Sequence, residues 1–189
     1  MWGVRMLEVA PIWQPHIQQQ NYRLLLEAMS RPGTVHPIQG LSRTSNSLQA
    51  VLAALLDGSV RFCDLSERLE TSDIALLQAI QTVPEEADYL LCSGIDAPDF
   101  QPRLGSLASP EQSATLLVHV EALQAGDLQL DLTGPGIKQN RVCNIQGLDA
   151  DWLVKRESWV CGFPMGVDLI LLDQQQLMAL PRTTRVEVH

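Results

Sequence analysis

Two arginines and two threonines lie together near the carboxyl end of the chain. Pro181-Arg182-Thr183-Thr184-Arg185 combines two hydroxyl donors with two guanidinium groups, each able to fork onto the oxygens of a phosphate or carboxylate. Arg182, Thr183 and Thr184 therefore predict an anion-binding site. A structural or subunit-interface role stays open, because threonines favour strands and arginines near a chain end often form surface ion pairs.

A glycine-rich turn is the second candidate for anion binding. Leu132-Thr133-Gly134-Pro135-Gly136-Ile137 follows a predicted strand. Gly134 and Gly136 would let backbone N–H groups approach a phosphate closely. No Gly-Lys-Ser/Thr sequence follows, so the segment is not a P-loop. A tight turn between two strands explains the same glycines.

A carboxylate, Asp168, lies at the head of the apolar run 167–172, which is typical of a central strand covered on both faces. A charged group at such a place needs a partner. We expect a structural ion pair with Arg182 or Arg185. The functional alternative is a general base or a metal ligand, but no second carboxylate stands at metal-binding spacing.

Other catalytic chemistry has little support in the sequence. There is no Gly-x-Ser-x-Gly elbow, and the four histidines are scattered. Lys138 and Lys155 are the two lysines, and neither neighbourhood indicates an amine with a depressed pKa. We therefore predict no catalytic residue, no metal site and no cofactor.

The cysteine spacing excludes a close metal cluster, since no Cys-x-x-Cys occurs. We expect all four to be buried as small hydrophobic side chains. They are Cys63, Cys92, Cys143 and Cys161.

The elements that must position these residues alternate between helix and strand patterns. Helical spacing of apolar residues predicts helices near 15–30, 46–57, 71–83 and 149–159. In the last helix, Trp152 and Leu153 would face inward, and Lys155 and Arg156 outward. Strands are predicted near 34–38, 59–64, 88–92, 114–120, 127–132, 167–172 and 177–180. Ala125-Gly126 predicts a hairpin between the fourth and fifth of them. The order favours a mixed sheet flanked by helices.

Composition narrows the class of protein further. The chain has 189 residues, of which 46% are hydrophobic, enough for the core of one domain, 1–189. The net charge of −9 disfavours nucleic acid and anionic lipid as partners. No apolar run approaches the ~18 residues of a membrane span, and no secretory signal opens the chain. We expect a cytoplasmic protein with reduced thiols.

Four segments together resemble the PhnH subunits of bacterial carbon–phosphorus lyase. They are residues 23–33 (RLLLEAMSRPG), 132–137 (LTGPGI), 163–171 (FPMGVDLIL) and 180–188 (LPRTTRVEV), in the order found in that family. One departure is Arg185, which stands where a family relative has histidine.

The resemblance implies a fold and a function. The fold would be a three-layer α/β/α arrangement with a mixed sheet, similar to a reduced pyridoxal-phosphate-transferase fold without the cofactor. The chain would be an accessory subunit of the lyase core complex and a homodimer when isolated. It would be required at the step that forms ribose 1-phosphonate 5-triphosphate from ATP and a phosphonate, contributing contacts more than catalytic groups.

Two alternatives remain open at this point. One is an autonomous domain that binds a phosphonate or a nucleoside triphosphate through Arg182, Thr183 and Thr184, with Gly134 and Gly136. The other is an independent enzyme that carries pyridoxal phosphate on Lys138 or Lys155.

Overall fold

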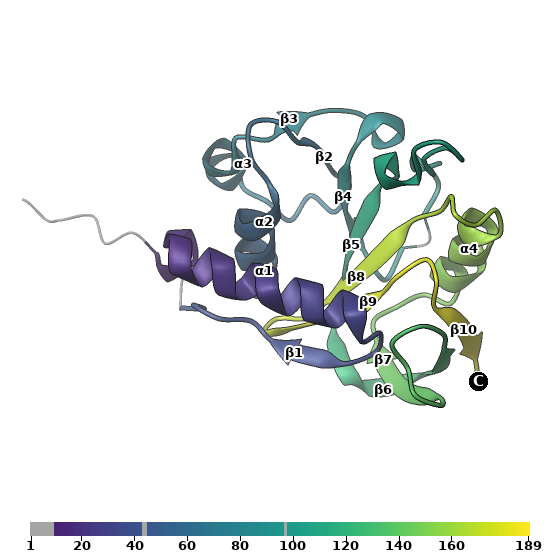
Figure 1. Ribbon diagram of the computed structural model, residues 1–189. Coiled ribbons are helices and arrows are strands. Elements are labelled where there is room, and N and C mark those ends of the chain that lie inside the picture. Colours follow the sequence, from purple (N-terminus) through teal and green to yellow (C-terminus); the bar gives the residue numbers. More distant parts are fainter. Residues whose placement is uncertain (1–9, 43–44, 97) are drawn as a thin grey trace, which may run out of the picture.

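The computed structural model describes residues 10–42, 45–96 and 98–189 and shows an α/β fold built around a mixed sheet (Figure 1). The helices are α1 (Pro15–Ser30), α2 (Ser47–Leu55), α3 (Thr71–Leu77) and α4 (Asp151–Val160). The strands are β1 (Val35–Pro37), β2 (Arg61–Asp64), β3 (Ile80–Gln81), β4 (Tyr89–Ser93), β5 (Thr115–His119), β6 (Ala122–Thr133), β7 (Arg141–Gln146), β8 (Asp168–Leu172), β9 (Gln176–Leu180) and β10 (Arg185–Val188). Short 3-10 turns lie at Pro11–Trp13, Pro84–Glu86 and Pro110–Gln112.

The larger sheet has seven strands in the order β1-β9-β8-β5-β4-β2-β3. From β8 to β3 all neighbours are parallel, whereas β9 runs antiparallel to both β8 and β1. A separate antiparallel sheet of three strands has the order β10-β6-β7. The predicted mixed sheet is therefore confirmed.

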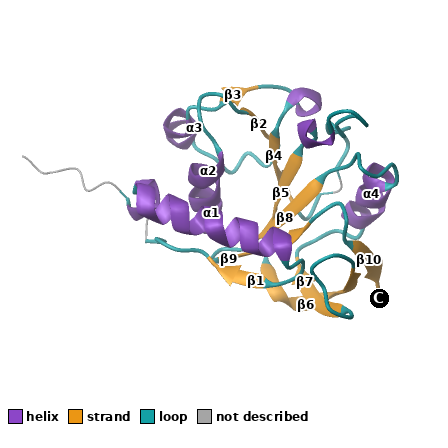
Figure 2. Cartoon of the chain, in the orientation of Figure 1, coloured by secondary structure: helices purple, strands orange, loops and turns teal. Residues whose placement is uncertain are grey.

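Different layers cover the two faces of the large sheet (Figure 2). On one face, α1, α2 and α3 pack through Leu25, Leu52 and Leu77 onto strand residues that include Phe62. On the other face lie α4, the small sheet and the extended segment 98–104. The second outer layer thus combines a helix with a sheet, which the predicted α/β/α order did not include.

Local sequence signals account for the helix ends. The side chain of Asn46 accepts a hydrogen bond from the backbone N–H of Gln49, and Gln49 returns one to the backbone of Asn46, which forms a capping box. Pro15 opens α1, where its missing N–H costs nothing. Within α1, Asn21 is fully buried and exchanges two hydrogen bonds with the backbone of Gln39.

Two predictions about elements are wrong. The third helix ends at Leu77, with Gln78 in the left-handed conformation, and Ile80 belongs to the edge strand β3, where it is half exposed. The hairpin at Ala125-Gly126 does not form, because β5 pairs only with β4 and β8 in the large sheet. Gly126, at φ +93°, instead lies in a bulge inside the long strand β6, which pairs with β7.

The cysteine prediction is confirmed for three residues of four. Cys63, Cys92 and Cys143 are buried, whereas Cys161 is exposed just beyond the end of α4. Its thiol donates to the carbonyl of Ser158, 3.1 Å away. Cys161 is the residue that follows α4, and its side chain is exposed although Trp159, two residues earlier, is buried.

Candidate functional site

The candidate residues meet at the amino end of β8. Asp168 is the first residue of that strand, and Arg182 follows β9, its antiparallel neighbour. Asp168 Oδ2 lies 2.7 Å from Arg182 Nη2, and Asp168 Oδ1 accepts from the backbone N–H of Arg182 at 2.7 Å and from Nε at 3.4 Å. Each side chain is only 15% exposed. The pair is therefore a forked, largely buried ion pair.

The rest of the Arg182 guanidinium is also engaged. Nη1 donates to the carbonyls of Pro110 (3.1 Å) and Pro164 (3.3 Å), and Nη2 donates to the hydroxyl of Ser113 as well as to Asp168. An arginine has five N–H groups, and each of the five has an acceptor here. Arg182 thus joins its own turn to the segments 110–113 and 164–168 and keeps no donor free for an anion.

A second arginine, Arg156 of α4, binds the same turn, residues 181–184. It is 1% exposed, so the prediction that Arg156 faces outward on its helix is wrong, while Lys155 is exposed as predicted. Its Nη2 donates to the carbonyls of Pro181 (2.6 Å) and Thr184 (2.9 Å). Burial lowers the pKa of Arg156. The helical periodicity predicted an exposed Arg156, because the sequence pattern does not show that the 181–184 turn packs over this side of α4.

The two threonines of the motif point to different surroundings. Thr183 is exposed, whereas Thr184 is 2% exposed and its Oγ1 has no partner among the described residues. The backbone N–H of Thr184 donates to the carbonyl of Pro181 at 2.9 Å, which closes the turn. Of the two threonines, Thr183 is therefore the one that solvent reaches.

The glycine turn lies beside the arginine turn, as an anion site would require. It joins β6 to β7, and the N–H of Ile137 donates to the carbonyl of Gly134 at 3.1 Å. A Cβ at Gly134 would come within 2.8 Å of the carbonyl oxygen of Thr183, and one at Gly136 would collide with the carbonyl of Ser30. Both glycines thus serve close contact with other parts of the chain.

A second charged group, which the sequence analysis missed, borders this cluster. Asp88 pairs with Arg103 at 2.5 Å and with Arg61 at 3.3 Å, and its Oδ2 accepts from the backbone N–H of Arg61. These residues line a polar pocket of about 510 Å³ together with Ser113. Arg103 Nε is buried and has no acceptor in the described part of the chain. No local motif indicates this group, because its members lie 15 and 27 residues apart.

Other candidate chemistry does not assemble around the cluster. Lys138 and Lys155 are both exposed. Within residues 10–42, 45–96 and 98–189, no group of three or more His, Cys, Asp or Glu side chains is placed to hold a metal ion. The helices of these same residues include none long and apolar enough to cross a membrane.

The fold and the site thus define a class of protein: an α/β protein with a buried Arg–Asp cluster at the amino end of its parallel strands. Residues 11–187 match the family model described as bacterial phosphonate metabolism protein (PhnH). The chain therefore belongs to the PhnH family, as the resemblance of its four motifs indicated.

Two curated relatives extend this match. The chain is 37% identical over 177 residues to a protein of Stutzerimonas stutzeri named putative C-P lyase subunit protein HtxG, covering 94% of this chain and 89% of the relative. It is 30% identical over 186 residues to the alpha-D-ribose 1-methylphosphonate 5-triphosphate synthase subunit PhnH of Rhizobium meliloti strain 1021, covering 89% of this chain and 90% of the relative. The similarity thus spans nearly the whole of each protein.

Proposed function

We propose that this chain is an accessory subunit of a carbon–phosphorus lyase core complex, required at the step that forms ribose 1-phosphonate 5-triphosphate from ATP and a phosphonate. The observation that carries the proposal is the family match over residues 11–187, with two relatives whose names call them lyase or synthase subunits. The proposal includes a cytoplasmic location and a homodimer in the isolated state. The predicted kinship with the fold of pyridoxal-phosphate transferases belongs to the same proposal and draws on the resemblance alone.

The geometry of the arginine cluster supports a subunit that contributes structure and contacts. Arg182 spends all its donors on Asp168, Ser113 and two carbonyls, so it stabilises the surface around it and does not present a free guanidinium. A buried ion pair of this kind fixes one conformation of the segments it joins.

Co-expression with the other candidate lyase subunits tests the proposal. An affinity-tagged form of this chain should be recovered in a stoichiometric complex of high mass on size-exclusion chromatography. The complex should lose formation of the ribose phosphonate when this chain is left out. A complex that assembles and turns over at the full rate without it contradicts the proposal.

One observation favours a second candidate function, the autonomous binding of a small anion. Arg61 and Arg103 both pair with Asp88 in a pocket that Glu111 also lines, and Arg103 Nε has no acceptor among the described residues. This polar pocket, more than the turn at Arg182, offers a donor to a phosphonate. Calorimetry of the purified chain with methylphosphonate and ATP tests it: Arg61→Ala should weaken binding about tenfold, and the exposed Arg185→Ala should not. Absence of heat with either ligand contradicts it.

A further inference from the structure

The order of the parallel strands creates a topological switch point between β2 and β4. From β2 the chain passes through α3 to β3 on one side, and then returns to place β4 on the other side of β2. The helix after β2 packs on the face that carries α1 and α2, since Leu77 belongs to that core. The segment after β4 packs on the opposite face through Phe100 and Leu104. In open α/β sheets, the crevice between two such diverging connections is the preferred place for a ligand.

A pocket of about 340 Å³ lies at this place. Leu65, which directly follows β2, and Cys92 and Ser93, which end β4, are part of its lining. The opposite wall is formed by Phe100 and by Trp152 from the first turn of α4. We call this the switch-point pocket. Its volume lies near the lower end of the range for small-molecule sites.

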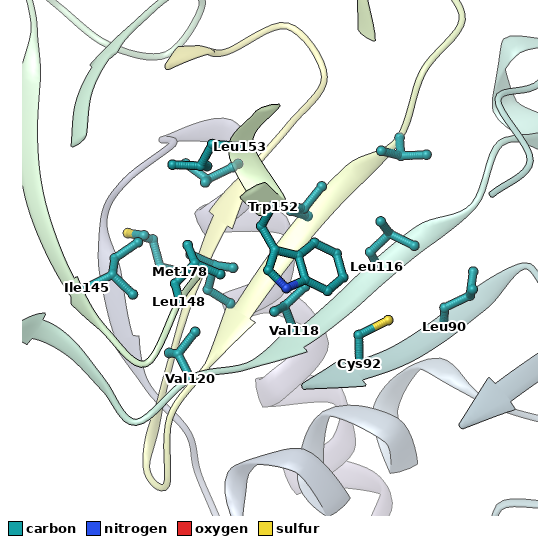
Figure 3. Close-up of a cluster of buried hydrophobic side chains, with 14 of the residues drawn as sticks. Leu90, Cys92, Leu116, Val118, Val120, Ile145, Leu148, Trp152, Leu153 and Met178 are labelled. Atoms are coloured by element: carbon teal, nitrogen blue, oxygen red, sulfur yellow. The ribbon is translucent and has the colours of Figure 1, made fainter. Parts of the chain in front are cut away.

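One polar atom of the pocket wall lacks a partner. Trp152 is 1% exposed, and its Nε1, which can only donate, has no acceptor among the described residues. Figure 3 shows its indole among Leu116, Val118 and Cys92, all of them apolar or weakly polar. A buried donor left without an acceptor is destabilising, and native proteins have few. A ligand acceptor placed in the pocket would remove that defect.

The charges around the pocket decide which ligands fit. Glu85, Asp96 and Asp99 belong to its lining, and none of the lining residues is Lys, Arg or His. The thiol of Cys92 stays neutral, because burial raises its pKa. Three carboxylates in a lining that contains no cation repel a phosphate or phosphonate. The partly exposed side chain of Phe100 suits a flat ring.

We propose that the switch-point pocket binds an uncharged, flat nitrogen heterocycle, whose ring lies against Phe100 and whose ring nitrogen or carbonyl accepts a hydrogen bond from Trp152 Nε1. The inference concerns a different place from the arginine cluster, which lies at the amino end of β8. It holds whether or not the chain works as a lyase subunit.

Nuclear magnetic resonance of the ¹⁵N-labelled chain tests the proposal. The indole N–H resonance of Trp152, assigned by its loss in Trp152→Phe, should shift on titration with adenine, cytosine or nicotinamide, while that of Trp159 should shift less. Adenosine monophosphate should bind at least tenfold more weakly than adenine. Lack of any shift of the Trp152 resonance at millimolar concentrations of all three bases overturns the proposal, and so does equal or tighter binding of the monophosphate.

Variants separate the pocket from other surfaces. Trp152→Phe keeps most of the ring and should weaken binding about two- to tenfold, as loss of one hydrogen bond does. Leu65→Tyr, at a residue 41% exposed, should fill the pocket and weaken binding more than tenfold without disturbing the core. The matched control is Leu76→Tyr on α3, 57% exposed and outside the pocket, which should bind as the wild type does. Equal binding by Leu65→Tyr and Leu76→Tyr contradicts the assignment to this pocket.

Discussion

Arg182 and Trp152 both carry buried nitrogen donors, and they lie toward opposite ends of the parallel strands. At the amino end of β8, all five N–H groups of Arg182 have acceptors from Asp168, Ser113 and two carbonyls. Beside the carboxyl end of β4, Trp152 Nε1 has no acceptor in the described part of the chain. From residue type alone, Arg182 would be assigned to a ligand site and Trp152 to the core, because arginine is the usual anion ligand and tryptophan the usual core residue. The satisfaction of each donor by the fold is what distinguishes a structural contact from a candidate site.

The largest expected change in stability comes from replacing Arg182. Arg182→Ala removes the guanidinium from Asp168, from two carbonyls and from the hydroxyl of Ser113, and leaves the Asp168 carboxylate only the backbone N–H of residue 182, in surroundings where both charged side chains are 15% exposed. We expect the free energy of unfolding to fall by about 3 kcal/mol, as for removal of one partner from a buried pair. Urea unfolding followed by circular dichroism measures it.

Arg185→Ala provides the control for that variant. Arg185 is exposed on the edge strand β10, so its removal should change the free energy of unfolding by less than about 0.5 kcal/mol. Equal losses in the two variants would show that the Asp168–Arg182 pair has no special role in stability.

Replacing Arg156, which binds the same turn, should lower the free energy of unfolding somewhat less. Arg156→Met keeps apolar contacts but removes the side-chain donor from the carbonyls of Pro181 and Thr184, of which Pro181 keeps the backbone N–H of Thr184, at a cost of about 2 kcal/mol. Lys155→Met, at an exposed neighbour, should be nearly neutral. Because Arg156 and Arg182 hold one turn, the double variant should depart from additivity by about 0.5 kcal/mol or more. Strict additivity would mean that the two arginines act independently.

The parts of the fold with local signals were predictable. The first helix was expected near 15–30 and α1 runs over Pro15–Ser30, because apolar spacing and the terminal Arg-Pro-Gly mark both ends. The second helix was expected from about residue 46, and Asn46 is the residue that caps α2. The strands expected near 167–172 and 177–180 are β8 and β9, and Asp173 stabilises the turn between them by accepting from the backbone N–H groups of Gln175 and Gln176.

The features of the fold that the sequence did not predict depend on contacts between distant residues. The strand β7 escaped prediction, and Gly126 was interpreted as a hairpin turn, since a bulge and a turn both need a residue at positive φ. Arg156 is buried only because a turn some 25 residues later covers it. At the site, the motifs located Asp168 and Arg182, but only the structure shows the acceptors contributed by Ser113, Pro110 and Pro164.

At the carboxyl end of β5, His119 predicts a moderate dependence of stability on pH. Its pKa lies below the usual value, mainly because the ring is half-buried and also because Arg68 is near, while Asp173 opposes the shift. The unfolded chain therefore binds a proton at higher pH than the folded one does. The free energy of unfolding should fall as the pH falls from about 7.5 through 6.5, the ordinary histidine pKa, toward the lower folded value.

Urea unfolding at pH 7.5, 6.5 and 5.5 measures this dependence. His119→Gln should flatten the dependence between those pH values, and His16→Gln, at an exposed place on α1, controls for the substitution itself. An unchanged slope in His119→Gln would assign the dependence to other groups.

Replacing a thiol should have the smallest effect on stability. The thiols also test whether the switch-point pocket is occupied. Cys161 is exposed, whereas burial raises the pKa of Cys92 and raises that of Cys143 to about 11. At pH 8 a pKa of about 11 leaves roughly a hundredfold less thiolate than an ordinary thiol has, so an aromatic disulfide reagent should modify one thiol quickly. Cys161→Ser should abolish that fast phase and change the free energy of unfolding by less than about 0.5 kcal/mol. In this background three buried thiols remain, and mass spectrometry of the modified peptides follows Cys92, which shares the pocket wall with Trp152. Adenine should slow the modification of Cys92 if the base occupies the pocket, and an unchanged rate at saturating adenine would place the base elsewhere.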